Sequence, residues 1–174
     1  MKNNALILFA LAFLMITSCQ NKKATTELEE LKAELQLTEQ NKKLAERWHN
    51  DLFIACNWKV AEEILAPDIV VHFPTGEDLK GLEQVRNLEA MAKNYINPEI
   101  KHYEIVAEGD YVTIRWDMAF DHTQDLMGIP ATGKRISNLH GIDLLRMENG
   151  KIAEFWQYYN EMEFMQQLGV IPAQ

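Results

Sequence analysis

The sequence predicts an α+β domain, in which helices from the first half pack on one face of a curved antiparallel sheet formed by the second half. Apolar residues recur at helical spacing up to residue 93, whereas residues 100–159 form runs that alternate between apolar and polar. Asn149-Gly150 separates two of these runs and favours a tight hairpin. Helices followed by a run of antiparallel strands are typical of the α+β class.

The chain opens with an apolar segment of signal-peptide length. Residues 5–16 contain no polar residue, and this run is too short to span a bilayer as a helix. It continues Ile16-Thr17-Ser18-Cys19, which resembles a bacterial lipobox, in which the cysteine becomes the new N-terminus and carries lipid. We therefore expect a lipoprotein signal peptide over residues 1–18, lipidation of Cys19, and a protein lipid-anchored in the bacterial cell envelope on the periplasmic side. An ordinary secretory signal with a chance cysteine is the alternative.

Residues 19–40 are predicted to form a tether and a charged helical stalk. Leu28, Leu31 and Leu35 lie at positions i, i+3 and i+7, which marks a narrow apolar stripe on a helix. Thr38 and Lys42 occupy the next positions, so a long coiled coil is not expected. A partner-binding helix is the alternative reading of the same stripe.

The globular domain is expected over residues 41–174. Apolar spacing predicts helices over 44–55 and 58–65, and the second ends before Pro67 because a residue that precedes proline disfavours helical geometry. A third helix is predicted over 79–93 and a last one over 161–168. The alternating runs predict strands over residues 68–73, 100–107, 111–122, 136–147 and 152–159.

Composition and spacing exclude several function classes. The net charge of −9 and the absence of a basic stripe argue against nucleic-acid binding. If Cys19 is acylated, Cys56 has no partner for an intramolecular disulfide. The histidines show no His-x-His or His-x₃-His pair, so no metal site is expected. There is also no phosphate-binding loop and no GxSxG motif.

An ordered set of short motifs spans the domain from about Leu44 to Val170. The set is Pro67-Asp68, His72, Gly81-Leu82-Glu83, Gly109-Asp110-Tyr111-Val112, Arg115-Trp116, His122, Gly128–Lys134, Gly141-Ile142-Asp143, Arg146, Asn149–Ile152, Glu154, Trp156 and Gln167-Leu168-Gly169. It resembles the SnoaL-like polyketide cyclases of the nuclear transport factor two-like superfamily. The resemblance implies a cone-shaped fold with a deep apolar pocket, and dimerisation through the sheet is common in that superfamily. It also implies cofactor-free ring closure by aldol condensation, with a His and an Asp that handle the proton.

Three residues are candidates for that proton transfer: His122, His140 and Asp143. His122 shares a strand face with Trp116, Met118 and Phe120, and an imidazole at the rim of an apolar wall can act as acid or base. The resemblance also aligns His122 with the pocket His of the family. His140 and Asp143 lie on opposite faces of the next strand, so only one of them is expected in the pocket.

Each of these three candidates has a structural alternative. His122 would cap the end of its strand in water. His140 would pack against a neighbouring strand. Asp143 would form a salt bridge to Arg115 or Arg146 on the outer face.

A second group of residues is predicted to line the pocket without necessarily reacting. Trp48 and Tyr95 are candidates for its floor, and the resemblance places His72 at its mouth. In the last strand Trp156, Tyr158 and Asn160 share a face. Family members often carry an acid at the position of Asn160, where an amide can bond a ligand carbonyl but does not titrate. The predicted pocket residues are Trp48, His72, Tyr95, Trp116, Met118, Phe120, Trp156, Tyr158 and Asn160.

The leading functional hypothesis is a cofactor-free cyclase-like or isomerase-like enzyme that acts on a hydrophobic carbonyl compound. A non-catalytic lipoprotein that binds an apolar small molecule in the same pocket is the alternative. A membrane-surface interaction domain that uses the stalk helix as its partner site is the third. The expected partners are an apolar ligand or substrate, a membrane through the lipid anchor, and a second copy of the chain in a homodimer.

Overall fold

The computed structural model describes residues 2–74 and 76–172, with side chains from residue 23 onward. The chain divides into two compact units, Met1–Glu39 and Gln40–Gln174. The predicted signal peptide and the lipidation site Cys19 lie outside the residues whose side chains are described. No helix in the described part of the chain is long and apolar enough to cross a membrane.

The first unit is helical and belongs to α1 (Lys2–Arg47). Within it, the side chains of Leu28, Leu31 and Leu35 are each at least half exposed. The apolar stripe predicted for the stalk therefore lies on the surface of this unit.

The second unit contains the remaining helices, all of them short. The end of α1 leads into a π-helix, η1 (Trp48–Ile54), and then into the 3-10 helix η2 (Trp58–Val60) and α2 (Ala61–Ile64). The helix predicted over 79–93 is instead interrupted, because it begins with a two-residue strand and contains a break after Val85. Its helical parts are α3 (Leu82–Val85) and α4 (Leu88–Ala92), and α5 (Glu161–Leu168) ends the domain at the predicted positions.

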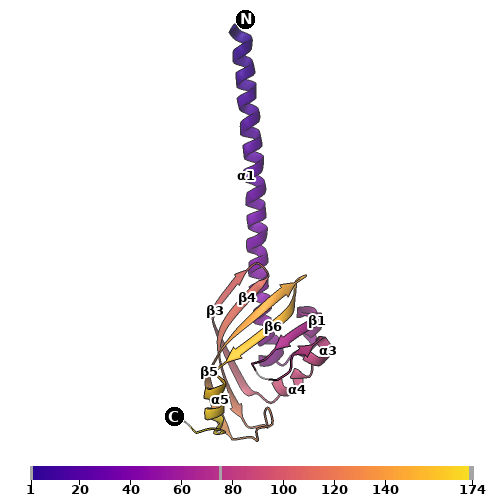
Figure 1. Ribbon diagram of the computed structural model, residues 1–174, viewed down its shortest axis with the longest axis vertical. Coiled ribbons are helices and arrows are strands. Elements are labelled where there is room, and N and C mark those ends of the chain that lie inside the picture. Colours follow the sequence, from indigo (N-terminus) through magenta and orange to yellow (C-terminus); the bar gives the residue numbers. More distant parts are fainter. Residues whose placement is uncertain (1, 75, 173–174) are drawn as a thin grey trace. The chain divides into compact units, whose positions relative to one another are not determined.

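A curved six-stranded sheet forms the other layer (Figure 1). The strands are β1 (Leu65–His72), β2 (Leu79–Lys80), β3 (Ile96–Glu108), β4 (Tyr111–His122), β5 (Lys134–Glu148) and β6 (Lys151–Tyr159). Their spatial order is β2-β1-β6-β5-β4-β3. The predicted α+β class is confirmed, although one pair departs from the antiparallel expectation, since β1 runs parallel to β6. These two strands are far apart in sequence, so no hairpin fixes their relative direction.

Strands β3 to β6 form an antiparallel meander connected by turns. At the β5–β6 turn Asn149 and Gly150 both have positive φ, of 51° and 73°, as the predicted tight hairpin requires. A bulge interrupts β5 at Asn138, where φ is 54° and the register against β4 shifts. Because of this bulge both Ile136 and Leu139 are buried, although strict alternation would place them on opposite faces.

The core lies between the inner face of the sheet and the helices η1 to α5. Its largest fully buried side chains include Trp48, Phe120, Phe155 and Phe164. The rings of Trp48 on η1 and Phe155 on β6 have centroids 4.3 Å apart, which joins η1 to the last strand of the chain. The sheet and η1 therefore form one packed body, in which the functional site is found.

Candidate active site

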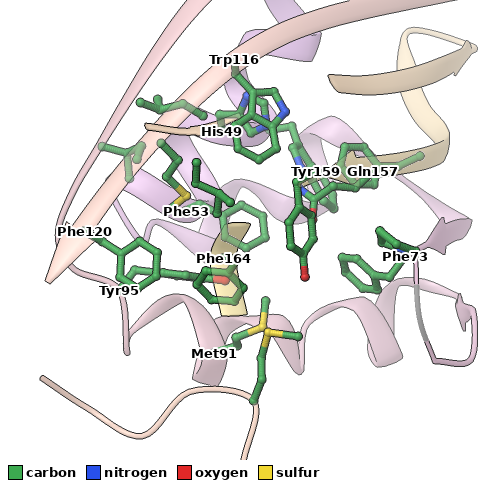
Figure 2. Close-up of a pocket in the computed structure, with 18 residues that line it drawn as sticks. His49, Phe53, Phe73, Met91, Tyr95, Trp116, Phe120, Gln157, Tyr159 and Phe164 are labelled. Atoms are coloured by element: carbon green, nitrogen blue, oxygen red, sulfur yellow. The ribbon is translucent and has the colours of Figure 1, made fainter. Parts of the chain in front are cut away.

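A cavity of about 150 Å³ lies between the inner face of the sheet and the helices (Figure 2). Most of its wall is aromatic or aliphatic, and β4 contributes Trp116, Met118 and Phe120. The lining residues with a nitrogen or oxygen atom in the side chain are Trp48, His49, Tyr95, Trp116, Gln157 and Tyr159. The cavity therefore combines an apolar surface with a few hydrogen-bonding groups, the usual composition of a small-molecule site.

His49 in the cavity wall forms a buried pair with Asp143. The Nε2 atom of His49 lies 2.6 Å from Oδ2 of Asp143, and the two side chains are 5 % and 0 % exposed. On the other side of the ring, Nδ1 of His49 lies 2.9 Å from Nε2 of His102. The His49 imidazole is thus held at both nitrogens, between a second imidazole and a carboxylate.

The sheet register brings these three residues together. His102 lies on β3 and pairs across to Trp116 on β4, which in turn pairs with Gly141 on β5. Asp143 lies two residues beyond Gly141 and therefore on the same, inner face. His102 and Asp143 reach His49 from either side of β4.

Trp116 supports this arrangement because its indole lies across Gly141. A Cβ atom built on Gly141 would be only 2.1 Å from Cζ2 of Trp116. The Trp116 ring meets the His49 ring edge-on, with centroids 5.8 Å apart. The absence of a side chain at position 141 thus lets the indole reach the His49 imidazole.

Burial keeps several groups around the cavity neutral. Burial, together with the neighbouring His49, lowers the pKa of His102 to about 4. Burial also raises the pKa of the Tyr95 and Tyr159 hydroxyls, so both remain protonated donors near neutral pH.

Two further buried atoms, Nε1 of Trp116 and Oδ1 of Asp143, have no hydrogen-bond partner among the described protein atoms.

His122, the leading candidate from the sequence, occupies a different place. It is fully buried at the end of β4, where its Nδ1 lies 2.9 Å from Oγ1 of Thr132 and accepts the Thr132 backbone N–H. It is not among the residues that line the cavity. The strand partner of Asp143 is Ile114, and residues 114 to 122 of β4 span about 26 Å at the usual rise per residue. The structure therefore does not bring His122 together with Asp143.

His140 and Asp143 lie on opposite faces of β5, as the alternation predicted. His140 is exposed on the outer face, where its Nδ1 contacts Oδ1 of Asp117. The outer-face salt bridge considered for Asp143 is not formed, because Asp143 is buried and Arg115 bonds Glu104 instead. Of the two residues, Asp143 is therefore the one that reaches the cavity region.

Five of the nine predicted pocket residues line the cavity, and the other four do not. Trp48, Tyr95, Trp116, Met118 and Phe120 line the cavity. The last strand differs from the prediction, since β6 turns Phe155, Gln157 and Tyr159 to the cavity while Trp156 and Tyr158 lie on the outer face. Aromatic residues occur at both even and odd positions of this strand, so the sequence alone does not show which of its faces lines the cavity.

His72 and Asn160 also lie away from the cavity. The His72 ring stacks on Trp156 and bonds the carboxylates of Asp78 and Glu154, at 2.9 and 3.0 Å. Asn160 is the N-cap of α5, and its Oδ1 accepts the backbone N–H of Glu163. The sequence Asn160-x-x-Glu163 carries this cap signal. These two residues therefore connect structural elements.

Sequence reasoning missed His49 and His102. Ala45, Trp48, His49 and Leu52 follow the i, i+3, i+4, i+7 pattern of a buried helix face, which could have marked His49 as inward-facing. The π-helical turn that carries His49 has no comparable sequence signal. Such turns are frequent at functional sites. His102 alternates with Ile100 on the inner face of β3, a weaker signal, because many strand histidines are only packing residues.

No three His, Cys, Asp or Glu side chains in the described part of the chain lie close enough to hold a metal ion.

A family model for the SnoaL-like polyketide cyclases matches residues 43–168. The chain belongs to this family. The match covers the π-helix, the whole sheet and α5, and hence every residue of the cavity. A comparison with curated proteins found no match.

Solved structures share the fold of this SnoaL-like domain. A candidate SnoaL-like polyketide cyclase from Jannaschia sp. CCS1 is 19 % identical with a TM-score of 0.70, over 78 % of this chain and 95 % of that one. TsrD from Streptomyces laurentii is 22 % identical with a TM-score of 0.67, over 76 % and 97 %. An LEH-like epoxide hydrolase from M. tuberculosis is 16 % identical with a TM-score of 0.61, over 76 % and 92 %. At these identities the likeness shows the fold alone.

Proposed function

We propose that this SnoaL-like domain binds an apolar carbonyl compound in the cavity and catalyses proton transfer on it without a cofactor. The proposal rests mainly on one observation, the buried His49–Asp143 pair in the wall of an otherwise apolar cavity. Membership of the SnoaL-like family makes ring closure or isomerisation of such a compound the natural reaction class.

His49 is the proposed acid–base group. With Asp143 as acceptor, the proton of neutral His49 lies on Nε2 and the lone pair on Nδ1. A proton removed from a carbon next to the ligand carbonyl would convert His49 to an imidazolium, whose charge the adjacent Asp143 carboxylate offsets. Because Nδ1 contacts His102, productive binding requires the ligand to approach this nitrogen in place of His102.

The resulting enolate needs a hydrogen-bond donor in the same cavity. Tyr95 and Tyr159 line the cavity, and their raised pKa values keep both hydroxyls protonated. The amide of Gln157 is a further donor. These groups support binding of the carbonyl oxygen while the aromatic wall holds the apolar remainder.

A second candidate function, ligand binding without reaction, is favoured by one observation. Both His49 nitrogens have partners in the structure, so the cavity offers hydroxyl and amide groups more readily than a free base. Native mass spectrometry of the full chain would identify a co-purified ligand, which is then incubated with the wild type and with His49→Gln. The glutamine can keep both hydrogen bonds but does not titrate.

The enzyme proposal expects the wild type to convert that ligand and His49→Gln to bind it unchanged. Binding by both proteins without conversion by either would replace the enzyme with the binding module.

We also propose the cellular location and the dimer that the sequence analysis predicts. Lipid on Cys19 would anchor the domain to a membrane of the bacterial cell envelope, on the periplasmic side, and dimerisation through the sheet is expected from the family. Intact-mass measurement of the membrane-fraction protein tests the anchor. The wild type should carry an acyl-sized mass increase and start at residue 19, while Cys19→Ser should show neither. Size-exclusion chromatography with light scattering tests the dimer.

A further inference from the structure

The hydrogen-bonded row His102–His49–Asp143 leads from the edge of the sheet to the buried carboxylate. His102 lies on β3, the edge strand, and is partly exposed without lining the cavity. His49 and Asp143 are almost completely buried. His102 is therefore the member of the row with access to solvent outside the cavity.

We infer that His102 is a positioning residue that relays protons between solvent and the buried His49–Asp143 pair. The row is continuous, with contacts of 2.9 Å between the imidazoles and 2.6 Å to the carboxylate. This inference rests on the proposed function and deepens it, since His49 can lose a proton taken from the ligand through His102 once the ligand has left and the His49–His102 contact has formed again.

The relay balances as a shift of one proton. In the resting row, His102 donates Nε2–H to Nδ1 of His49, and His49 donates Nε2–H to Asp143. When a proton binds Nδ1 of His102, the Nε2–H bond of His102 breaks as an Nδ1–H bond forms on His49. The positive charge then lies on His49 beside the carboxylate, and His102 is neutral in its other tautomer. The reverse shift releases a proton to solvent.

The surroundings favour this distribution of charge. Burial disfavours a charge on His102 itself, whereas the imidazolium form of His49 contacts Asp143 directly. The other charged groups on η1 and on the helices packed against it pair with each other or are exposed: Asp51 with Arg47, Glu89 with Lys93, and Lys59. They leave the carboxylate of Asp143 as the charge bonded to the row.

Nitrogen-15 NMR of the histidine-labelled full chain tests the relay during an acid titration. We expect the first proton taken up by the row to give His49 the signature of an imidazolium, while His102 stays neutral and its proton moves from Nε2 to Nδ1. A charged His102 beside a neutral His49, or a His102 tautomer that never changes, would overturn the relay.

His102→Gln supplies the matched variant. The amide can donate to or accept from His49 but cannot pass a proton through its side chain. We expect the ring proton of His49 to exchange with solvent more slowly in this variant than in the wild type. His140→Gln, which removes an exposed histidine on the outer face, should leave that exchange rate unchanged. If the His49 ring proton exchanges equally fast in His102→Gln and in the wild type, the relay is contradicted. A wild type that shows the tautomer change but turns over no ligand would contradict the proposed function and leave the relay standing.

Discussion

Trp116 on β4 lies directly opposite Gly141 on β5, and its indole ring fills the space that a side chain at position 141 would need. The same ring meets the His49 imidazole edge-on. One strand pair therefore sets both a wall of the cavity and the support for the proposed base.

Gly141→Ala is expected to destabilise the domain by about 1–3 kcal/mol, as overpacking in a dense core does. The added methyl would lie within 2.5 Å of three indole carbons, so Trp116 must move. Urea unfolding of the two proteins measures the difference. In a Trp116→Leu background the same substitution should cost much less. An equal cost in both backgrounds would show that the indole is not the obstacle.

Asp143→Asn should destabilise the fold by about 2 kcal/mol, since it replaces a buried charged acceptor of the His49 N–H by an amide. Asp117→Asn is the matched control, because Asp117 also contacts a histidine, but on the outer face, where the His140 partner is more than half exposed. Its effect should be smaller, because solvent screens exposed pairs. If both variants lose a similar free energy of unfolding in urea, the buried pair stabilises the fold no more than the pair on the outer face.

His72 predicts one pH dependence of stability. Burial lowers its pKa, but the hydrogen bonds to Glu154 and Asp78 outweigh this, and the net pKa is raised above the ordinary 6.5. The folded state then holds the proton more tightly than the unfolded chain. The stabilisation is complete below pH 6.5 and is lost as pH rises through the folded-state pKa. The advantage of the wild type over His72→Gln in urea unfolding should therefore shrink with rising pH. An advantage that grows with pH would contradict the assigned sign.

His102 predicts the opposite dependence. Its pKa is lowered from 6.5 to about 4 by burial and by His49, so the unfolded chain binds a proton more readily than the native state. This group favours folding above pH 6.5, and the benefit is lost as pH falls toward 4. The stability of His102→Gln should therefore decrease less than that of the wild type on acidification. If the stability of the variant falls more steeply on acidification than that of the wild type, the lowered pKa does not belong to His102.

A larger side chain in the cavity should block ligand binding. Met118 lines the cavity from β4, and Met118→Trp would fill much of its volume of about 150 Å³. We expect the variant to lose the fluorescence enhancement of anilinonaphthalene sulfonate that the wild type gives. Ile142→Trp adds a similar ring at an exposed position on the outer face and should keep the signal. Retained fluorescence in Met118→Trp would place the dye outside the cavity.

Local patterns in the sequence predicted much of the sheet. The limits of β4 and α5 and the Asn149-Gly150 hairpin follow from alternation, helical spacing and turn chemistry, all of which act within a few residues. The chain order of helices and strands was sufficient for the α+β class.

The site was less predictable because it depends on contacts between distant residues. His49 acquires its role only when β3 and β5 bring His102 and Asp143 to it, across 53 and 94 positions of sequence. The bulge at Asn138 and the aromatic residues on both faces of β6 made strand parity ambiguous. His122 had the residue type expected of a base but lies at the far end of β4, bonded to Thr132.

The central claim is that His49, held by Asp143 in the cavity wall, removes a proton from a carbon next to a carbonyl. Deuterium uptake by 2-tetralone, a hydrophobic ketone, in D₂O measures this step without knowledge of the natural substrate. The account predicts that the wild-type protein accelerates uptake, that His49→Gln loses about 100-fold or more of that acceleration, and that His140→Gln keeps it. Equal uptake with the wild type and His49→Gln, or no acceleration by the wild type, would contradict it.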